Sequence, residues 1–148
     1  MKLAAKGHYA PPPKLPKRAQ RVSETLATWP RVHARTHWQL TDETIVDGAD
    51  FYLGRGPLAG EIGHLHLDGQ AHVAMPAPAA AALISSRLAH KFPYGRGFVV
   101  LDIDSERTVE QALWLFRLSY DFLRGAKLQA LLARIEERAS QGPLDRAG

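Results

Sequence analysis

Residues 61–75 read Glu61-Ile62-Gly63-His64-Leu65-His66-Leu67-Asp68-Gly69-Gln70-Ala71-His72-Val73-Ala74-Met75. On both sides of Asp68-Gly69, apolar and polar residues alternate, which is typical of half-buried β-strands. Asp-Gly between two such runs is a strong signal for a hairpin with a two-residue type I′ turn, because both central residues of that turn need positive φ. The segment therefore predicts two paired strands, and such a turn would place His64 opposite Val73 and His72 on the other face.

Further helices and strands flank this hairpin on both sides. The spacing of apolar residues predicts helices over residues 19–29, 79–91, 109–123 and 127–139, and strands over residues 32–38, 49–55 and 98–103. Thr108-Val109-Glu110-Gln111 fits a capping box at the start of the third helix. The order of these elements favours an α+β domain with a mainly antiparallel sheet of about five strands and helices packed on one face. The other face of the sheet would then be open to a ligand or a partner subunit.

Composition and charge limit the classes of protein that fit. The chain has 148 residues and no cysteine, which suits one domain and excludes disulfides, thiolate zinc sites and cysteine nucleophiles. Residues 1–30 carry six basic groups and one acidic group, whereas residues 31–148 are close to neutral. We divide the chain into a disordered, proline-rich basic leader (1–18), an α+β domain (19–125) and a C-terminal helix and tail (126–148). Nucleic acid is not an expected partner, because a nucleic-acid-binding domain would carry its positive charge on a folded face.

No apolar run approaches the ~20 residues that a membrane span needs. Lys2 and Lys6 interrupt the region where a signal peptide would have its apolar stretch. We therefore expect a cytoplasmic protein without membrane association. The helix predicted over residues 127–139 could form a homodimer surface or simply cover the sheet.

His64 and His66 are the main candidates for chemistry, because alternation in a strand puts both imidazoles on one face. Three interpretations compete. The histidines could simply pack on a half-buried sheet. They could bind a metal, but zinc or iron needs further ligands, which would have to come from His90, Glu61 or Asp68. They could also line a metal-free pocket in which a neutral histidine moves a proton near pH 7.

Substrate-binding candidates surround this pair in the predicted fold. Arg55 or Arg96 would balance the charge of an anionic substrate. The loop Tyr94-Gly95-Arg96-Gly97 could be a mobile lid or a plain connection. We assign Arg55, Arg96, Tyr94 and Met75 to substrate binding, and we expect a small-molecule ligand. No G-x-S-x-G motif is present, which argues against a serine hydrolase.

The order of several pieces resembles the luciferase family, whose namesake is the fungal luciferase. These pieces are Glu61-Ile62-Gly63-His64-Leu65-His66, the hairpin, the next helix, His90 with Pro93 after it, the strand from Phe98 and the helix over 109–123. The resemblance covers residues 22–124. It implies oxidation of a hydroxylated pyrone, 3-hydroxyhispidin in the fungal enzyme, by molecular oxygen without an added metal or organic cofactor. It also implies catalytic roles for Glu61, His64, His66 and His90.

From this resemblance we expect a cofactor-independent oxygenase acting on a planar, enolisable aromatic or pyrone-type compound, with oxygen as co-substrate and no bound metal. A histidine would remove an enol proton, and Arg55 or a second imidazole would stabilise the enolate. Two alternatives remain open. One is a non-catalytic interaction or nucleic-acid-binding module that uses the basic leader. The other is a metal-dependent enzyme that uses the His64-x-His66 pair.

Overall fold

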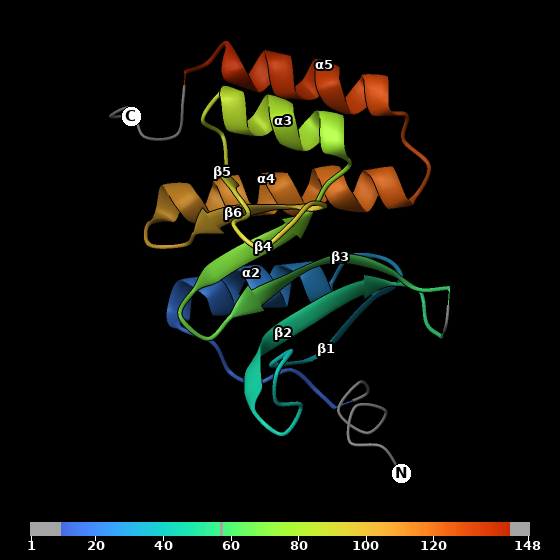
Figure 1. The fold of residues 1–148 in the computed structure, drawn as a ribbon, viewed down its shortest axis with the longest axis vertical. Helices are drawn as coiled ribbons and strands as arrows, with labels where there is room; N and C mark the ends of the chain where they lie inside the picture. The colour runs from blue at the N-terminus through green and yellow to red at the C-terminus, as the bar shows by residue number, and fades with distance from the viewer. Residues whose placement is uncertain (1–9, 57, 143–148) are drawn as a thin grey trace.

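A computed structural model describes residues 10–56 and 58–142 of the chain. Its centre is a six-stranded antiparallel sheet in the order β1-β2-β3-β4-β6-β5 (Figure 1). The strands are β1 Val32–Trp38, β2 Val46–Leu53, β3 Gly60–His66, β4 Gln70–Ala74, β5 His90–Lys91 and β6 Phe98–Asp102. The α+β prediction is confirmed, and the additional strand is the two-residue β5, which pairs with β6 at the edge of the sheet.

The described residues form four helices: α2 Lys17–Ala27, α3 Ala77–Ser85, α4 Glu106–Leu123 and α5 Leu128–Ala139. α4 packs against β3, β4 and β6, α2 lies beside α4 against β1 and β2, and α3 packs against β5 and β6 (Figure 1). α5 packs on α3 and α4. None of the helices in the described ranges combines the length and hydrophobicity of a membrane span. Within residues 10–56 and 58–142, no helix covers the opposite face of the sheet, as the sequence predicted.

The core lies between the sheet and α4. Phe51 and Phe116 are fully buried, and their rings meet edge to face at 6.1 Å between centroids. The Tyr120 hydroxyl donates to the Pro30 carbonyl oxygen at 2.8 Å, so this large buried residue has its polar group satisfied. Ser119 on the same helix donates to the Ile62 carbonyl oxygen at 2.9 Å and thereby fixes β3 to α4. The position of β3 is therefore set by both packing and a buried hydrogen bond.

The hairpin between β3 and β4 differs from the prediction in its loop. Three residues, 67–69, connect the strands, and Gly69 takes a φ of +89° while its N–H donates to the His66 carbonyl oxygen at 3.0 Å. The extra residue shifts the register by one, so His64 pairs with His72 and not with Val73. Because side chains alternate with a period of two, this shift moves His72 onto the face that carries His64.

Two helix boundaries differ from the prediction by three residues or more, and the others by at most two. α4 begins at Glu106, three residues early, because Ser105 caps it: the Thr108 N–H donates to Ser105 Oγ at 3.1 Å and the Ser105 N–H to Thr108 Oγ1 at 2.9 Å. α3 ends at Ser85, and Arg87 follows in the left-handed region with a φ of +59°. That conformation turns the chain into β5, where the sequence predicted continued helix.

The expected leader falls partly outside the described residues, since residues 1–9 are not described. Residues 10–18 lie against the fold. The Thr36 N–H donates to the Ala10 carbonyl oxygen at 2.8 Å, the Thr36 hydroxyl donates to that of Pro11 at 2.6 Å, and Leu15 is buried in the core. α2 begins at Lys17, so this part of the chain is ordered against β1 and not a free tail.

Candidate functional site

Four imidazoles gather on the sheet face that the helices leave open; we call His37, His64, His66 and His72 the histidine cluster. They come from β1, β3 and β4. His37 stacks on His64 with 4.2 Å between ring centroids and 11° between planes. The rings of His66 and His72 are 4.3 Å apart, and His64 lies 4.9 Å from each of them. The predicted convergence of His64 and His66 is therefore present, and two further histidines join them.

Strand register explains why these four side chains meet. His64 lies directly between Asp50 on β2 and His72 on β4, so all three project from the same face. One row along, Gly48 lies between His37 and His66. Because Gly48 has no side chain, the flanking rings approach to 5.3 Å between centroids across the intervening strand. The absence of a side chain on the middle strand thus creates the contact.

A bulge in β3 adds Glu61 to the same face. Phe51 pairs with Gly63 and the next residue, Tyr52, pairs with Glu61, so Ile62 is the extra residue on β3. Regular alternation would turn Glu61 away from the histidines. The bulge instead brings Glu61 Oε2 to 2.8 Å from His64 Nδ1.

Each histidine of the cluster has one ring nitrogen directed at a side-chain oxygen. The pairs are His37 Nδ1 with Asp50 Oδ1 at 2.6 Å, His64 Nδ1 with Glu61 Oε2 at 2.8 Å, His66 Nδ1 with Asp47 Oδ2 at 3.0 Å, and His72 Nε2 with Gln70 Oε1 at 2.7 Å. The contacts of His64 and His72 are hydrogen bonds in which the oxygen accepts, so these two nitrogens carry protons. The Gln70 amide N–H₂ donates to Asp102 at 3.0 Å, which fixes the amide orientation and so the tautomer of His72.

The remaining nitrogens of three rings face one another. His64 Nε2 and His66 Nε2 lie 3.1 Å and 3.2 Å from His72 Nδ1. Burial, reinforced by the neighbouring imidazoles of His66, His64 and His37, lowers the pKa of His72 to about 3. His72 is therefore neutral at pH 7, and its Nδ1 offers a single lone pair to two neighbours.

The pKa values of two other rings are shifted in opposite directions. Burial and the adjacent His64 lower the pKa of His66. Burial also acts to lower that of His37, but the hydrogen bond and charge of Asp50, with the carboxylates of Asp47 and Glu61, outweigh it and raise the pKa of His37. The cluster therefore holds rings of different proton affinity side by side.

A cavity of about 260 Å³ lies beside the cluster over β1 and β2. His37, Asp50 and Glu61 line it together with Tyr52 and Trp38. The Tyr52 hydroxyl lies 3.4 Å from Glu61 Oε1, and burial together with the charges of Glu61 and Asp50 raises the pKa of Tyr52, so the phenol stays protonated and donates to Glu61. Two donors, Tyr52 and His64, thus hold the Glu61 carboxylate at the cavity wall.

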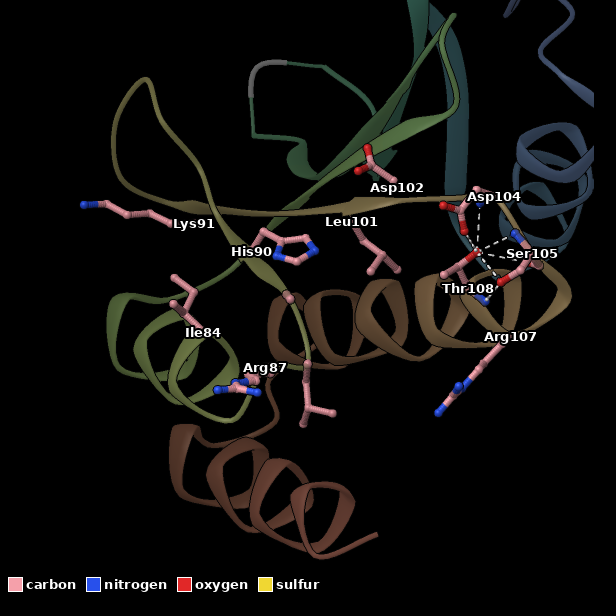
Figure 2. A pocket seen from close by; sticks show the side chains of 12 residues that line it. Ile84, Arg87, His90, Lys91, Leu101, Asp102, Asp104, Ser105, Arg107 and Thr108 are labelled. Carbon is pink, nitrogen blue, oxygen red and sulfur yellow. Dashed lines mark hydrogen bonds between the residues drawn. The ribbon is translucent and has the colours of Figure 1, made fainter. Parts of the chain in front are cut away.

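His90 lies apart from the cluster. It sits exposed on β5 opposite Val100, and β6 separates it from His72. It lines a different and larger cavity, of about 550 Å³, with Arg87, Lys91 and the start of α4 (Figure 2). Size alone would favour this larger cavity as the ligand site, but none of the four clustered histidines lines it, so we place the candidate site at the smaller one.

The predicted substrate-binding residues also lie outside the cluster. Met75 is 4% exposed and belongs to the helix-covered core, because it alternates with the residues of β4 that face the histidines. Arg55 follows the end of β2, where its Nε donates to His33 Nδ1 at 3.1 Å. Tyr94 and Arg96 are exposed on the loop before β6. Phe92 connects this loop with the cluster, because its ring contacts those of His72 and Tyr94 at 5.1 Å and 5.8 Å.

Sequence analysis missed five polar residues that complete the site: His37, Asp47, Asp50, Gln70 and His72. His37 is distant in sequence and becomes a neighbour of His64 only through the β1–β2–β3 pairing. The position of His72 could have been predicted from the hairpin sequence, because pairing polar residues with polar residues across the two strands places His72 opposite His64. The carboxylates carry no local spacing signal that would assign them to these histidines.

Comparison with known proteins gave one match. No curated protein and no solved structure matches the chain significantly. Residues 59–119, from the start of β3 to near the end of α4, match the family model described as the luciferase domain, so the resemblance predicted from the sequence is confirmed over the segment that carries Glu61, His64, His66 and His72.

Proposed function

We propose that this domain binds a planar, enolisable compound of the hydroxylated-pyrone type in the cavity beside the histidine cluster and promotes its oxidation by molecular oxygen. The observation that carries the proposal is the position of Glu61. It lines the 260 Å³ cavity, and it is also hydrogen-bonded to the cluster through His64 at 2.8 Å. The luciferase-domain match supports an oxygenase-type reaction as the class of chemistry.

The cavity wall supplies a base in a fixed orientation. The Glu61 carboxylate accepts from His64 at one oxygen and from Tyr52 at the other, so little reorganisation is needed when a substrate hydroxyl approaches. Transfer of the enol proton to Glu61 leaves an electron-rich enolate. The aromatic side chain of Trp38 and the ring of His37 line the same cavity and suit a flat ligand.

The oxidation balances with oxygen as the sole oxidant. The enolate gives one electron to O₂, which produces superoxide and a substrate radical, and the two recombine with formation of a carbon–oxygen bond to give a peroxide. Both oxygen atoms remain in this product, and the proton on Glu61 is available to neutralise the peroxide anion. The protein's role is to bind the substrate, remove the proton and stabilise the anion.

The test combines binding and oxygen consumption. A hydroxylated pyrone is titrated without oxygen, where formation of the enolate appears as an absorbance shift, and oxygen uptake is then measured with an electrode. Glu61→Gln keeps the size of the side chain and removes its charge, so we expect a rate lower by about 10²–10⁴-fold, the range of general-base catalysis.

The matched control is His33→Gln. His33 lies on β1 like His37, but its side chain contacts Arg55 away from the cavity. This variant should keep the wild-type rate. Absence of enolate formation and oxygen uptake in the wild-type protein, or an unchanged rate in Glu61→Gln, would contradict the proposal.

A further inference from the structure

We propose that the histidine cluster binds one divalent transition-metal ion through His37, His64 and His66, whose ligand atoms all lie within 4.8 Å of one another, with His72 beside them. This inference goes beyond the proposed function, because it names a resident ion and is tested without any substrate. It departs from the family-based expectation of a site without metal.

The first step is the shortage of protons between the rings. Glu61 and Gln70 accept from the outer nitrogens of His64 and His72. His72 Nδ1 is then a lone pair, and His64 Nε2 and His66 Nε2 lie 3.1 Å and 3.2 Å from it. Since this lone pair can accept from only one of the two rings, one of the two contacts is left without a hydrogen bond. A cation among these nitrogens would supply the missing interaction.

The second step is the separation of the donor atoms. Zinc–imidazole bonds of 2.0–2.1 Å in a tetrahedral site place two ligand nitrogens about 3.3 Å apart. The two inner contacts at His72 are close to this value. His37, His64 and His66 also offer ligand atoms that all lie within 4.8 Å of one another. The donor set is nitrogen-rich, which suits zinc, iron, cobalt or copper and disfavours calcium or magnesium.

The third step is the outer layer around the rings. Histidines that bind metals usually donate the other ring N–H to a carboxylate or amide oxygen, which fixes the ring and raises its basicity. His64 and His72 have such a partner, and Asp102 in turn holds Gln70. Carboxylate oxygens of Asp50 and Asp47 lie 2.6 Å and 3.0 Å from Nδ1 of His37 and His66. A pair of histidines that merely packed on a sheet would not need an acidic or amide oxygen beside every ring.

The fourth step is charge. Asp47, Asp50 and Glu61 bring three carboxylates to the cluster, and Arg35, opposite Asp50, is the guanidinium in the same cross-strand row. The three carboxylates outnumber this guanidinium on a half-buried face, and a divalent cation would offset the difference. Bound here, the ion would supply positive charge next to Glu61 and could stabilise an anionic ligand.

The experiment uses the full chain and the metal alone. Protein purified without chelator is analysed for its metal content, then stripped and titrated with Co²⁺ and Zn²⁺ while the visible absorption of Co²⁺ is followed. We expect one ion per chain and weaker binding in His37→Gln and His66→Gln. Asp47→Asn, which removes the carboxylate beside His66 and His37, should weaken binding about 10–100-fold. His90→Gln, an exposed histidine outside the cluster, is the control and should bind as the wild type does.

A second measurement does not depend on folded variants. In wild-type protein with ¹⁵N-labelled histidine, metal should shift one ring nitrogen in each of His37, His64 and His66, while the resonances of the His90 ring stay unchanged. Absence of stoichiometric binding, or binding that the cluster substitutions and the His90 control affect equally, overturns the inference. Because no substrate is present, this result is separate from oxygen uptake, which tests the proposed function.

Discussion

Replacing Gly63 with alanine should cost about 3 kcal/mol of unfolding free energy, the upper end of the range for overpacked cores. An added Cβ would lie 2.5 Å from the His72 carbonyl oxygen, 2.7 Å from Phe116 Cε1 and 3.1 Å from Val73 Cα. Two of these obstacles are backbone atoms of β4 and the third belongs to a fully buried ring, so none can move aside easily. The strands must separate or the bulge must change, and His64, the next residue, would move with it.

Equilibrium urea unfolding followed by circular dichroism measures this loss. Because the free energy of unfolding falls by about 1–3 kcal/mol per molar urea, a loss of 3 kcal/mol lowers the urea concentration at the unfolding midpoint by roughly 1–3 M. The control on the same strand is Gly60→Ala, whose Cβ would meet only the flexible tip of Leu123, at 2.9 Å. This variant should cost less than about 1 kcal/mol, because alanine also lowers the entropy of the unfolded chain. Equal midpoints for the two variants would refute the role given to Gly63.

Three further predictions test the core and the surface. Met75→Ala should lower the unfolding free energy by about 2–5 kcal/mol in urea titrations and leave metal binding unchanged, because the side chain lies in the core and not at the cluster. Ser119→Ala should cost about 1–3 kcal/mol, since it leaves the buried carbonyl oxygen of Ile62 without its donor. The hydrogen bond from Arg21 lowers the pKa of Glu106 in the folded protein. The Arg21–Glu106 ion pair therefore stabilises the fold at pH values above the unfolded-state pKa of Glu106. This stabilisation is lost as pH falls through the folded-state pKa. NMR titration of the Glu106 carboxyl should show its pKa rise towards the ordinary value in Arg21→Gln.

Local patterns were sufficient to predict most of the fold. Apolar periodicity gave the order of helices and strands, because each element buries one face on the same core. β5 was not predicted, because its two exposed residues carry no periodicity and form a strand only by pairing with β6. The predicted start of α4 was three residues late, because Ser105 and Thr108 are both suitable N-cap residues. Which of them caps the helix depends on which hydroxyl reaches the free backbone N–H groups.

The candidate site was only partly predictable, and the hairpin shows why. Asp68-Gly69 is compatible with a two-residue or a three-residue loop, and local sequence does not choose between them. Contacts from other strands make the choice. The Ile103 N–H donates to the Gly69 carbonyl oxygen at 3.1 Å, and the Leu67 N–H donates to that of Asp47 at 3.0 Å. Both partners lie far from the loop in sequence, so no window around the hairpin contains this information.

The same register links the core to the histidine cluster. In the predicted register, Leu65 would face His72, which would bring an imidazole into the helix-covered core. In the observed register, Leu65 faces Ala71, both are fully buried, and His72 joins His64 on the other side. Burying the apolar residues of β4 therefore requires that the imidazoles meet. The burial of the apolar residues of β4 thus sets the distance of 3.1 Å between His64 Nε2 and His72 Nδ1.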